Sequence, residues 1–294
     1  MHLRLLGTGS ADGWPNAFCQ CVSCEAQRAS GVLRGQTSAL LRVDGTAVLL
    51  DPGPEVLAAA TRCGESLADV RVVLVTHAHA DHFGPQLLLF RSWVSDEPLD
   101  VVGPAAVVEE ARRWVAPDST VRFHAVDAGG VLELGADRRG AEVRGGGETF
   151  RVQVLPAAHS VMAPGDAVLY DVTGPDGARV LWACDTGPWE TSWFETVRDA
   201  AYDAVLVEET FGDRADLGSG HLHLATLGSL LERLREVGAV TTSTEVVAVH
   251  LSHHNPSEDE LVRRLAELGA RPGRDGERWS RPVAGPRSAP GARL

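Results

Sequence analysis

The stretch that decides this fold is Val70-Arg-Val-Val-Leu-Val75, followed at once by Thr76-His-Ala-His-Ala-Asp-His82. A β-branched run that ends at histidines and a carboxylate is typical of a buried strand that delivers polar side chains to a loop. His77 and His79 are two residues apart, so in an extended chain their side chains point to the same side. Asp81-His82 follows where the chain should turn into the next helix. Four metal-binding groups so close together predict a site for two cations.

The composition limits the classes of protein and partner. The chain has 294 residues, of which 44% are hydrophobic and 23% charged, so it can form one large α/β domain or two small ones. The formal net charge is −13 and the pI is about 5.3, and no Lys/Arg run stands out. A long nucleic acid is therefore not expected as a partner, whereas a small phosphorylated substrate held by metals is compatible. The N-terminal segment breaks at Gly7, and no apolar run approaches ~20 residues, so we expect a cytoplasmic protein without a membrane partner.

Strand-like and helix-like segments alternate in both halves of the chain, which predicts an α/β fold: a four-layer αββα sandwich with two sheets face to face and helices outside. Asp44-Gly45 indicates a hairpin and Gly145–Gly147 a turn. We expect one domain over 1–280 and a disordered tail over 281–294. The predicted strands are 2–6, 37–43, 46–51, 70–75, 100–103, 120–126, 131–134, 149–155, 166–173, 179–184, 203–209 and 245–250. The predicted helices are 55–62, 84–95, 104–115, 189–200, 222–237 and 257–268, the last capped by Ser257.

Three more polar residues stand where apolar strands end. His159 follows the strand at 149–155, Asp185 follows the strand at 179–184, and His250 ends the strand at 245–250. A loop-borne site on a rigid scaffold needs such residues at strand ends. We therefore expect these three side chains to join the cluster of histidines after Val75.

A cysteine cluster, Cys19-Gln-Cys21-Val-Ser-Cys24, lies in a long irregular stretch at 11–36. Three thiolates need a fourth ligand to complete a tetrahedral zinc site, and His253 or His254 can supply it. A structural zinc would stabilise a loop of this length, which otherwise lacks an obvious anchor. We expect the other two cysteines, Cys63 and Cys184, to be ordinary strand, surface or core residues without a functional role, and the same holds for His2 and His124.

Together these residues resemble the metallo-β-lactamase fold hydrolases over about residues 1–280. The motif Thr76-His-x-His-x-Asp-His82 is highly specific, and His159, Asp185 and His250 follow in the same order and at similar spacing. The resemblance implies two active-site cations, Zn²⁺ or Mn²⁺, with a bridging water that ionises near neutral pH and acts as the nucleophile. It implies that one cation is held by His77, His79 and His159 and the other by Asp81, His82 and His250, with Asp185 bridging them.

The cysteine loop narrows the resemblance. A CxCxxC cluster after the first Gly-Thr-Gly, with a His-x-x-His near the end, resembles the PhnP-type phosphodiesterases, which hydrolyse cyclic ribose phosphates. That resemblance implies a structural zinc on Cys19, Cys21, Cys24 and His253. The PqqB proteins of quinone-cofactor biosynthesis have a similar loop, and Gly13-Trp-Pro15 resembles theirs. They usually lack the intact histidine motif, so its presence here favours a working hydrolase.

A segment further along the chain suggests the catalytic acid. Glu208-Glu-Thr-Phe211 followed by Gly220-His221-Leu-His223 resembles the part of phosphodiesterases and tRNase Z in which a histidine protonates the leaving oxygen. His221 takes that position, and its ordinary pKa suits proton donation near neutral pH. His221 and Asp81 are therefore our candidate catalytic residues. The role of His223 stays open between helix packing and a substrate contact.

Four hypotheses of function follow. The leading one is a dinuclear-metal phosphodiesterase that cleaves a small cyclic phosphate ester or a nucleotide-like compound with His221 as general acid. The second is a tRNase Z-like nuclease that processes RNA 3′ ends. The third is another hydrolase of the same fold that acts on a lactone or thioester, and the fourth is a PqqB-like accessory protein. A homodimer is compatible with all four.

Overall fold

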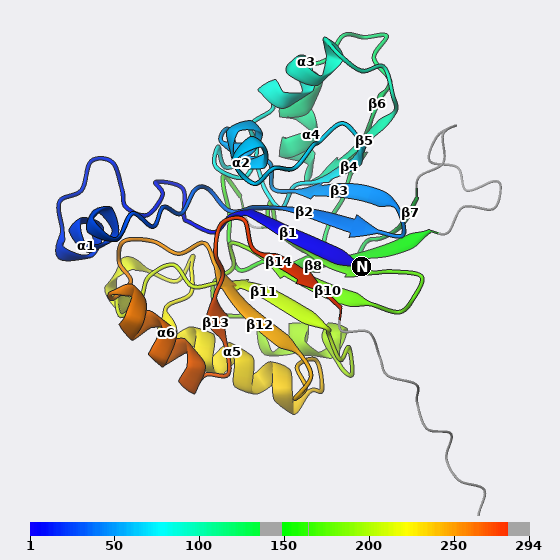
Figure 1. The fold of residues 1–294 in the computed structure, drawn as a ribbon. Helices are drawn as coiled ribbons and strands as arrows, with labels where there is room; N and C mark the ends of the chain where they lie inside the picture. Colours follow the sequence, from blue (N-terminus) through cyan, green and yellow to red (C-terminus); the bar gives the residue numbers. More distant parts are fainter. Residues whose placement is uncertain (136–148, 164, 282–294) are drawn as a thin grey trace, which may run out of the picture.

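Two mixed β-sheets stack face to face in the computed structural model, which describes residues 1–135, 149–163 and 165–281 (Figure 1). Each sheet has seven strands. The first has the order β14-β1-β2-β3-β4-β5-β6, with β14 (Arg278–Ser280), β1 (His2–Gly7), β2 (Ser38–Val43), β3 (Thr46–Leu50), β4 (Val70–Leu74), β5 (Leu99–Gly103) and β6 (Val121–Ala125). The second has the order β13-β12-β11-β10-β9-β8-β7, with β13 (Arg271–Pro272), β12 (Glu245–Val249), β11 (Ala204–Glu208), β10 (Arg179–Ala183), β9 (Val168–Thr173), β8 (Phe150–Pro156) and β7 (Val131–Leu134).

Helices cover the outer face of each sheet (Figure 1). On the first sheet these are α2 (Val56–Arg62), α3 (Gln86–Ser92) and α4 (Ala105–Arg112). On the second they are α5 (Leu224–Glu236), α6 (Glu258–Glu267) and the 3₁₀ segment η1 (Thr191–Val197). Three buried apolar clusters fill the spaces between these four layers, one between the sheets and one under each set of helices. The predicted αββα sandwich is confirmed.

Local sequence explains the main elements. In β4 the valines and Leu74 are buried, and β11 is buried throughout, as expected for strands covered on both sides. The hairpin between β2 and β3 turns at Asp44 (φ 46°) and Gly45 (φ 80°), and a two-residue turn with both φ values positive matches the twist of the strands. Local sequence therefore specifies these strands, whose ends lead into the loops of the candidate site.

Helix α5 shows how the outer layers attach. Its leucines recur three and four residues apart, so one stripe of the helix is apolar and packs on the second sheet. Truncating one such buried leucine to alanine typically costs ~2–5 kcal/mol. Within the described residues, no helix is long and apolar enough to cross a membrane.

The stretch at 11–36 is not irregular throughout, because it contains a helix, α1 (Val22–Ser30). The prediction missed it because the residue before the helix is Cys21, whose Sγ accepts the backbone N–H of Cys24 in place of the usual serine or aspartate oxygen. Gly31 ends the helix in the left-handed conformation (φ 71°). In Figure 1, α1 projects away from the two sheets.

Several shorter elements differ from the prediction. The segment predicted as a helix at 189–200 forms the 3₁₀ segment η1, and the helix predicted at 84–95 is only Gln86–Ser92. The short strands β13 and β14 were not predicted, since they exist through pairing with β12 and β1. Ser257 precedes α6, but its side chain makes no capping hydrogen bond. The predicted turn at Gly145–Gly147 and all but the first residue of the predicted tail lie outside the described residues.

Candidate functional site: two histidine–carboxylate clusters

All the predicted active-site ligands come together at one end of the sandwich. They follow the ends of four strands, β4 in the first sheet and β8, β10 and β12 in the second. Ligand atoms of His77, His79, His159 and Asp185 lie within 4.8 Å of one another, and so do those of Asp81, His82, Asp185 and His250. Because Asp185 belongs to both groups, the structure places two potential cation sites side by side with a shared carboxylate.

In the first group, three imidazole nitrogens converge. His77 Nε2 lies 2.9 Å from His79 Nδ1, and His159 Nε2 lies 3.1 Å from the same His79 atom. Asp185 Oδ2 is 3.5 Å from His77 Nε2 and 3.7 Å from His159 Nε2. Burial lowers the pKa of both His77 and His79, so their rings are neutral and present lone pairs. Neutral imidazoles with one carboxylate are a suitable set for a divalent metal.

In the second group, His82 is fully buried between carboxylates. Its Nε2 lies 3.1 Å from Asp81 Oδ2 and 3.3 Å from Asp185 Oδ2, yet neither ring nitrogen makes a hydrogen bond of good geometry. Burial alone would lower the pKa of His82, but Asp185 and Asp81 outweigh it and raise the pKa well above its ordinary value. The negative charge of Asp81 and Asp185 that favours a proton on His82 would equally favour a bound cation. These residues therefore fit a metal ion.

His250 completes the second group. Its Nε2 lies 3.2 Å from Asp185 Oδ1 and 3.3 Å from Asp81 Oδ2. The neighbouring histidines lower the pKa of Asp81 and hold that of Asp185 well below its ordinary range, against the opposing effect of burial. Both carboxylates are therefore ionised and available as ligands.

Hydrogen bonds to the ring nitrogen that points away from the cluster set the tautomer of three candidate ligands, His77, His159 and His250. The Thr76 hydroxyl donates to Asp51, which can only accept, so it can accept in turn from His77 Nδ1–H at 2.9 Å. His159 Nδ1 faces the Gly220 carbonyl at 2.8 Å, and a carbonyl also only accepts. In both histidines the proton therefore sits on Nδ1, and the Nε2 lone pair faces the cluster.

The same arrangement recurs at His250. The Thr210 hydroxyl donates to the buried carboxylate of Glu208 and lies 2.9 Å from His250 Nδ1. Because its hydrogen is committed to Glu208, the hydroxyl oxygen accepts from His250 Nδ1–H. His250 Nε2 thus presents its lone pair to Asp81 and Asp185.

The backbone at the site is held in an uncommon conformation. Asp51, Asp185 and His250 have positive φ values of 45°, 57° and 57°, although none is glycine. Such residues cost on the order of 1–2 kcal/mol each and cluster at functional sites. Each follows the end of a strand, so the sharp turn directs its side chain into the site.

Close backbone contacts join the loops of the second sheet. A Cβ on Gly187, two residues after Asp185, would lie 1.9 Å from the Ser219 carbonyl oxygen, so only glycine fits. The Gly187 N–H donates to the Ala158 carbonyl at 3.0 Å. The loops that carry His159, Asp185 and His221 are therefore packed against one another.

His221 lies beside the second group. Its Nδ1 is 2.9 Å from Glu208 Oε2, and its ring stacks on that of His250 with 5.4 Å between centroids. Burial would lower its pKa, but Glu208 and Asp185 outweigh burial and raise the pKa to about 9. His223, whose role was left open, is the N-cap residue of α5, and its backbone N–H donates to Thr226 Oγ1.

Two buried carboxylates beside the site were given no role of their own from the sequence, although Glu208 begins the Glu208-Glu-Thr-Phe211 segment that pointed to His221. Asp51 Oδ2 accepts from Trp182 Nε1 at 2.7 Å and lies 3.2 Å from His82 Nδ1, while Glu208 Oε1 accepts from the Thr186 N–H at 2.6 Å. Both carboxylates are fully buried. Asp51 follows strand β3 and Glu208 ends strand β11, so the rule that selected His159 and Asp185 could have found them.

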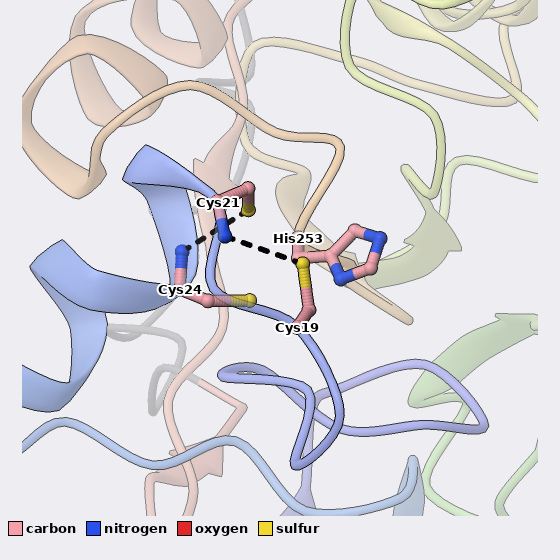
Figure 2. A group of neighbouring side chains, drawn as sticks. All are labelled: Cys19, Cys21, Cys24 and His253. Atoms are coloured by element: carbon pink, nitrogen blue, oxygen red, sulfur yellow. Dashed lines mark hydrogen bonds between the residues drawn. The ribbon is translucent and has the colours of Figure 1, made fainter.

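The cysteine cluster forms a second, separate group (Figure 2). Ligand atoms of Cys19, Cys21, Cys24 and His253 lie within 4.8 Å of one another. Backbone N–H groups of Cys21 and Cys24 donate to the sulfurs of Cys19 and Cys21, each at 3.4 Å. Against the effect of burial, the N–H of Cys24 lowers the pKa of Cys21, which favours a thiolate.

Of the two histidines considered for this cluster, the structure brings His253 to the thiols. Its Nδ1 is buried without a hydrogen-bond partner, as a ligand nitrogen would be. His254 instead packs edge-on against Phe211, with 6.2 Å between ring centroids. Three sulfurs and one imidazole fit a tetrahedral zinc ion.

The remaining cysteines and histidines lie outside both proposed ligand sets. Cys184 is fully buried beneath the site, near Asp51 and His82, and Cys63 ends α2. His124 pairs with Asp100 at 2.7 Å on the first sheet. Cys184 is thus a core residue, Cys63 lies at the end of a helix, and His124 forms a partly buried ion pair with Asp100.

Two sequence relatives span different parts of the chain. Coenzyme PQQ synthesis protein B of Azoarcus sp. (strain BH72) is 26% identical over 299 aligned positions, which cover 92% of this chain and 95% of that protein. Ribonuclease Z of Mycobacterium avium (strain 104) is 33% identical over 116 positions, which cover 37% of this chain and 35% of the relative. The first likeness extends over nearly the whole chain, and the second over about a third.

Solved structures share the fold. Zn²⁺-bound PqqB from Methylobacterium extorquens superposes with a TM-score of 0.72 at 17% identity, covering 95% of this chain and 100% of the other. A diphosphatase from the PhnP family superposes with a TM-score of 0.70 at 19% identity, covering 95% and 96%. The family model described as the beta-lactamase superfamily domain matches residues 46–268, which include all the residues of the two histidine–carboxylate clusters. This chain therefore belongs to the beta-lactamase superfamily and has the metallo-β-lactamase fold.

Proposed function

We propose that this protein is a dinuclear-metal phosphodiesterase that cleaves a small phosphate ester, with a cyclic ester as the preferred class. One observation carries the proposal: two ligand groups share Asp185, and His221 with its buried partner Glu208 lies directly beside them. Zn²⁺ or Mn²⁺ would be held by His77, His79 and His159 on one side and by Asp81, His82 and His250 on the other. A third ion, Zn²⁺, would be held by Cys19, Cys21, Cys24 and His253.

When bound, the two active-site cations supply a water of lowered pKa and positive charge that stabilises the phosphoryl oxygens. The chain supplies the geometry for this chemistry. Asp185 sets the separation of the two ligand groups, and buried Asp81 and Asp185 provide the negative charge that balances the cations. The tautomers of His77, His159 and His250 are set by Thr76, Gly220 and Thr210.

His221 would protonate the leaving alkoxide. Glu208 binds Nδ1, so Nε2 is the nitrogen that can face a leaving oxygen. The carboxylates of Glu208 and Asp185 raise its pKa to about 9, against the effect of burial, so the ring carries a proton at neutral pH. A protonated histidine near two cations is well suited to an ester with a poor leaving group, since the alkoxide must be neutralised as it departs.

The net charge of −13 supports a small substrate over a long nucleic acid, because an acidic protein repels a polyanion beyond the immediate reach of its metals. The likeness to a PhnP-family diphosphatase supports phosphorus chemistry as the reaction class, although the fold itself hosts many reactions.

A second candidate is a PqqB-like accessory protein, which is favoured by the sequence likeness over 92% of this chain. The two candidates differ in what they require of the site. A hydrolase needs both cations and a proton donor, whereas an accessory protein needs neither the shared carboxylate nor His221. The complete set of ligands and the His221–Glu208 pair favour the hydrolase.

The decisive experiment is a substrate screen of the purified protein loaded with Mn²⁺ or with Zn²⁺. The panel contains ribose and nucleoside cyclic phosphates, linear diesters, a lactone, a thioester and a tRNA precursor. We expect metal-dependent turnover of the cyclic phosphates, with the tRNA precursor uncleaved. Turnover confined to the lactone, the thioester or the precursor would contradict the proposed substrate class. No turnover of any substrate, with both cations bound, would support the accessory role.

A further inference from the structure

Two threonines occupy equivalent places on opposite sides of the site. Thr76 follows strand β4 of the first sheet, and Thr210 follows strand β11 of the second. Thr76 is fully buried and Thr210 is 4% exposed. Each hydroxyl lies between a fully buried carboxylate and a metal-binding histidine, so the two form carboxylate–threonine–histidine relays built from unrelated segments.

The first relay is Asp51–Thr76–His77. The Thr76 hydroxyl lies 3.0 Å from each oxygen of Asp51 and 2.9 Å from His77 Nδ1. Asp51 is held in turn by the backbone N–H of Thr76 at 2.7 Å and by the indole of Trp182, which reaches it from the second sheet. The carboxylate cannot rotate away, and the direction of the Thr76 hydroxyl is therefore set.

The second relay is Glu208–Thr210–His250. The Thr210 hydroxyl donates to Glu208 Oε2 and lies 2.9 Å from His250 Nδ1. Glu208 is held at its other oxygen by the Thr186 N–H. Its Oε2 also receives His221 Nδ1, so this relay touches the proposed acid as well as the ligand.

From this symmetry we propose that Thr76 and Thr210 are paired positioning residues, each of which sets the affinity of one active-site cation independently of the other. Thr76 acts through His77 on the first group, and Thr210 acts through His250 on the second. The inference rests on the metal assignment of the proposed function, but not on its substrate.

The hydrogen-bond donors and acceptors of each threonine–histidine pair explain this effect. A threonine hydroxyl whose hydrogen is given to a carboxylate can only accept from the histidine, which fixes the proton on Nδ1 and leaves Nε2 as the ligand atom. Without the hydroxyl, Nδ1–H is buried without an acceptor, and the alternative tautomer, which cannot bind a cation through Nε2, is no longer disfavoured. Loss of such a partner of a ligand typically weakens metal affinity by about 10–100-fold.

The test uses isosteric variants of the full-length protein. Thr76→Val and Thr210→Val remove only the hydroxyl, and Thr76→Ser and Thr210→Ser restore it. Stepwise Mn²⁺ titrations, followed by the electron paramagnetic resonance signal of free and bound ion, give the two apparent affinities. Histidine-selective ¹⁵N labelling reads the tautomer of each ring directly by NMR in the metal-loaded protein.

We expect each valine variant to lose about 10–100-fold in affinity for one cation and to keep the other within about twofold, with recovery in the serine variant. Double variants show which of the two cations each threonine affects. His77→Ala combined with Thr76→Val should match His77→Ala alone, whereas His77→Ala combined with Thr210→Val should also bind the remaining cation about 10–100-fold more weakly.

Three outcomes would overturn the proposal: unchanged affinities in both valine variants, equal loss of both cations in either one, or no recovery with serine. A valine variant that fails to fold is replaced by its alanine counterpart, and the serine variant must still restore both the affinity and the tautomer. Because turnover is not measured, a wrong substrate class would leave this result unaffected, so the two failures can be told apart.

Discussion

His221 Nδ1 and Glu208 Oε2 lie 2.9 Å apart, and the Glu208 carboxylate is completely buried. A buried carboxylate with no solvent around it interacts strongly with a positive imidazole, which is why His221 holds its proton. The pair lies next to His250 and Asp185, so the proposed acid and the proposed metal site share one polar network.

This arrangement predicts how His221→Ala behaves. We expect turnover of alkyl phosphodiesters to fall by about 10²–10⁴-fold, the usual range for a lost general acid. A nitrophenyl ester has a leaving group that needs no proton, so its turnover should fall far less. The measurement is kcat for both esters in both proteins at equal metal content. Equal losses on the two esters would exclude the acid role.

Glu208→Gln should also reduce turnover more for alkyl esters than for nitrophenyl esters, but by a smaller factor than His221→Ala. The amide keeps the shape of the side chain but removes the charge that holds the proton on His221. We expect a decrease of roughly 10–100-fold on alkyl esters and little change on nitrophenyl esters, as for other residues that act through a neighbour. Glu245→Gln, which changes a carboxylate that pairs with Arg271 away from the site, is the matched control.

The shared carboxylate predicts different metal losses for two variants. Asp185→Asn should weaken both active-site cations, because Asp185 belongs to both ligand groups. His159→Ala should weaken only one, because His159 belongs to one group. Elemental analysis after gel filtration in metal-free buffer gives the number of ions per chain. Loss of a single ion in Asp185→Asn would show that it does not bridge.

The cysteine cluster predicts a separable third ion. Cys21→Ser should lose one zinc per chain and unfold at a lower temperature, because metal binding to such a site contributes to folding. The two active-site ions should remain. Cys63→Ser, which removes a thiol outside the cluster, is the control for the loss of a cysteine. Zinc content equal to that of the wild-type protein would rule out the structural zinc.

The buried carboxyl group of Glu209 should make the free energy of unfolding depend on pH. Burial raises its pKa from 4.5 to about 8 in the folded protein, against opposing hydrogen bonds from Asn255 and the Gly212 N–H. The folded state thus binds this proton more tightly than the unfolded state, so its contribution to stability is complete below about pH 4.5 and is lost as the pH rises to about 8. Glu209→Gln keeps a neutral side chain and avoids this loss.

The measurement is urea unfolding of wild type and Glu209→Gln at several pH values between about 4.5 and 9. We expect the difference in free energy of unfolding to shift in favour of the variant as the pH rises, and to become constant above about pH 8. Titration of the histidines in the two histidine–carboxylate clusters affects both proteins alike and cancels in the difference. A difference that does not change with pH would mean that Glu209 is ionised in the folded protein.

Much of the architecture could be predicted from local sequence. The apolar runs at β4, β10 and β12 end at polar residues, and the hairpin at Asp44-Gly45 needs only its own two residues. These features depend on neighbours in the chain, so a single sequence displays them. Elements that exist through distant contacts were missed, among them β13 and β14, which are strands only because β12 and β1 pair with them.

For the candidate site, too, some features follow from the sequence and others depend on the tertiary structure. The sequence by itself determined which side chains can bind metal, since imidazole, carboxylate and thiolate chemistry belongs to the residues of the histidine motif and the cysteine loop. Only the tertiary structure shows which of them meet. It brings His253 to the thiols and Asp185 to both groups, as the family resemblance implied, and it places Asp51 and Glu208 behind the candidate ligands, which the sequence did not indicate. Ligand chemistry is a property of each residue, whereas the partner of a buried hydrogen bond is set by how segments distant in sequence pack together.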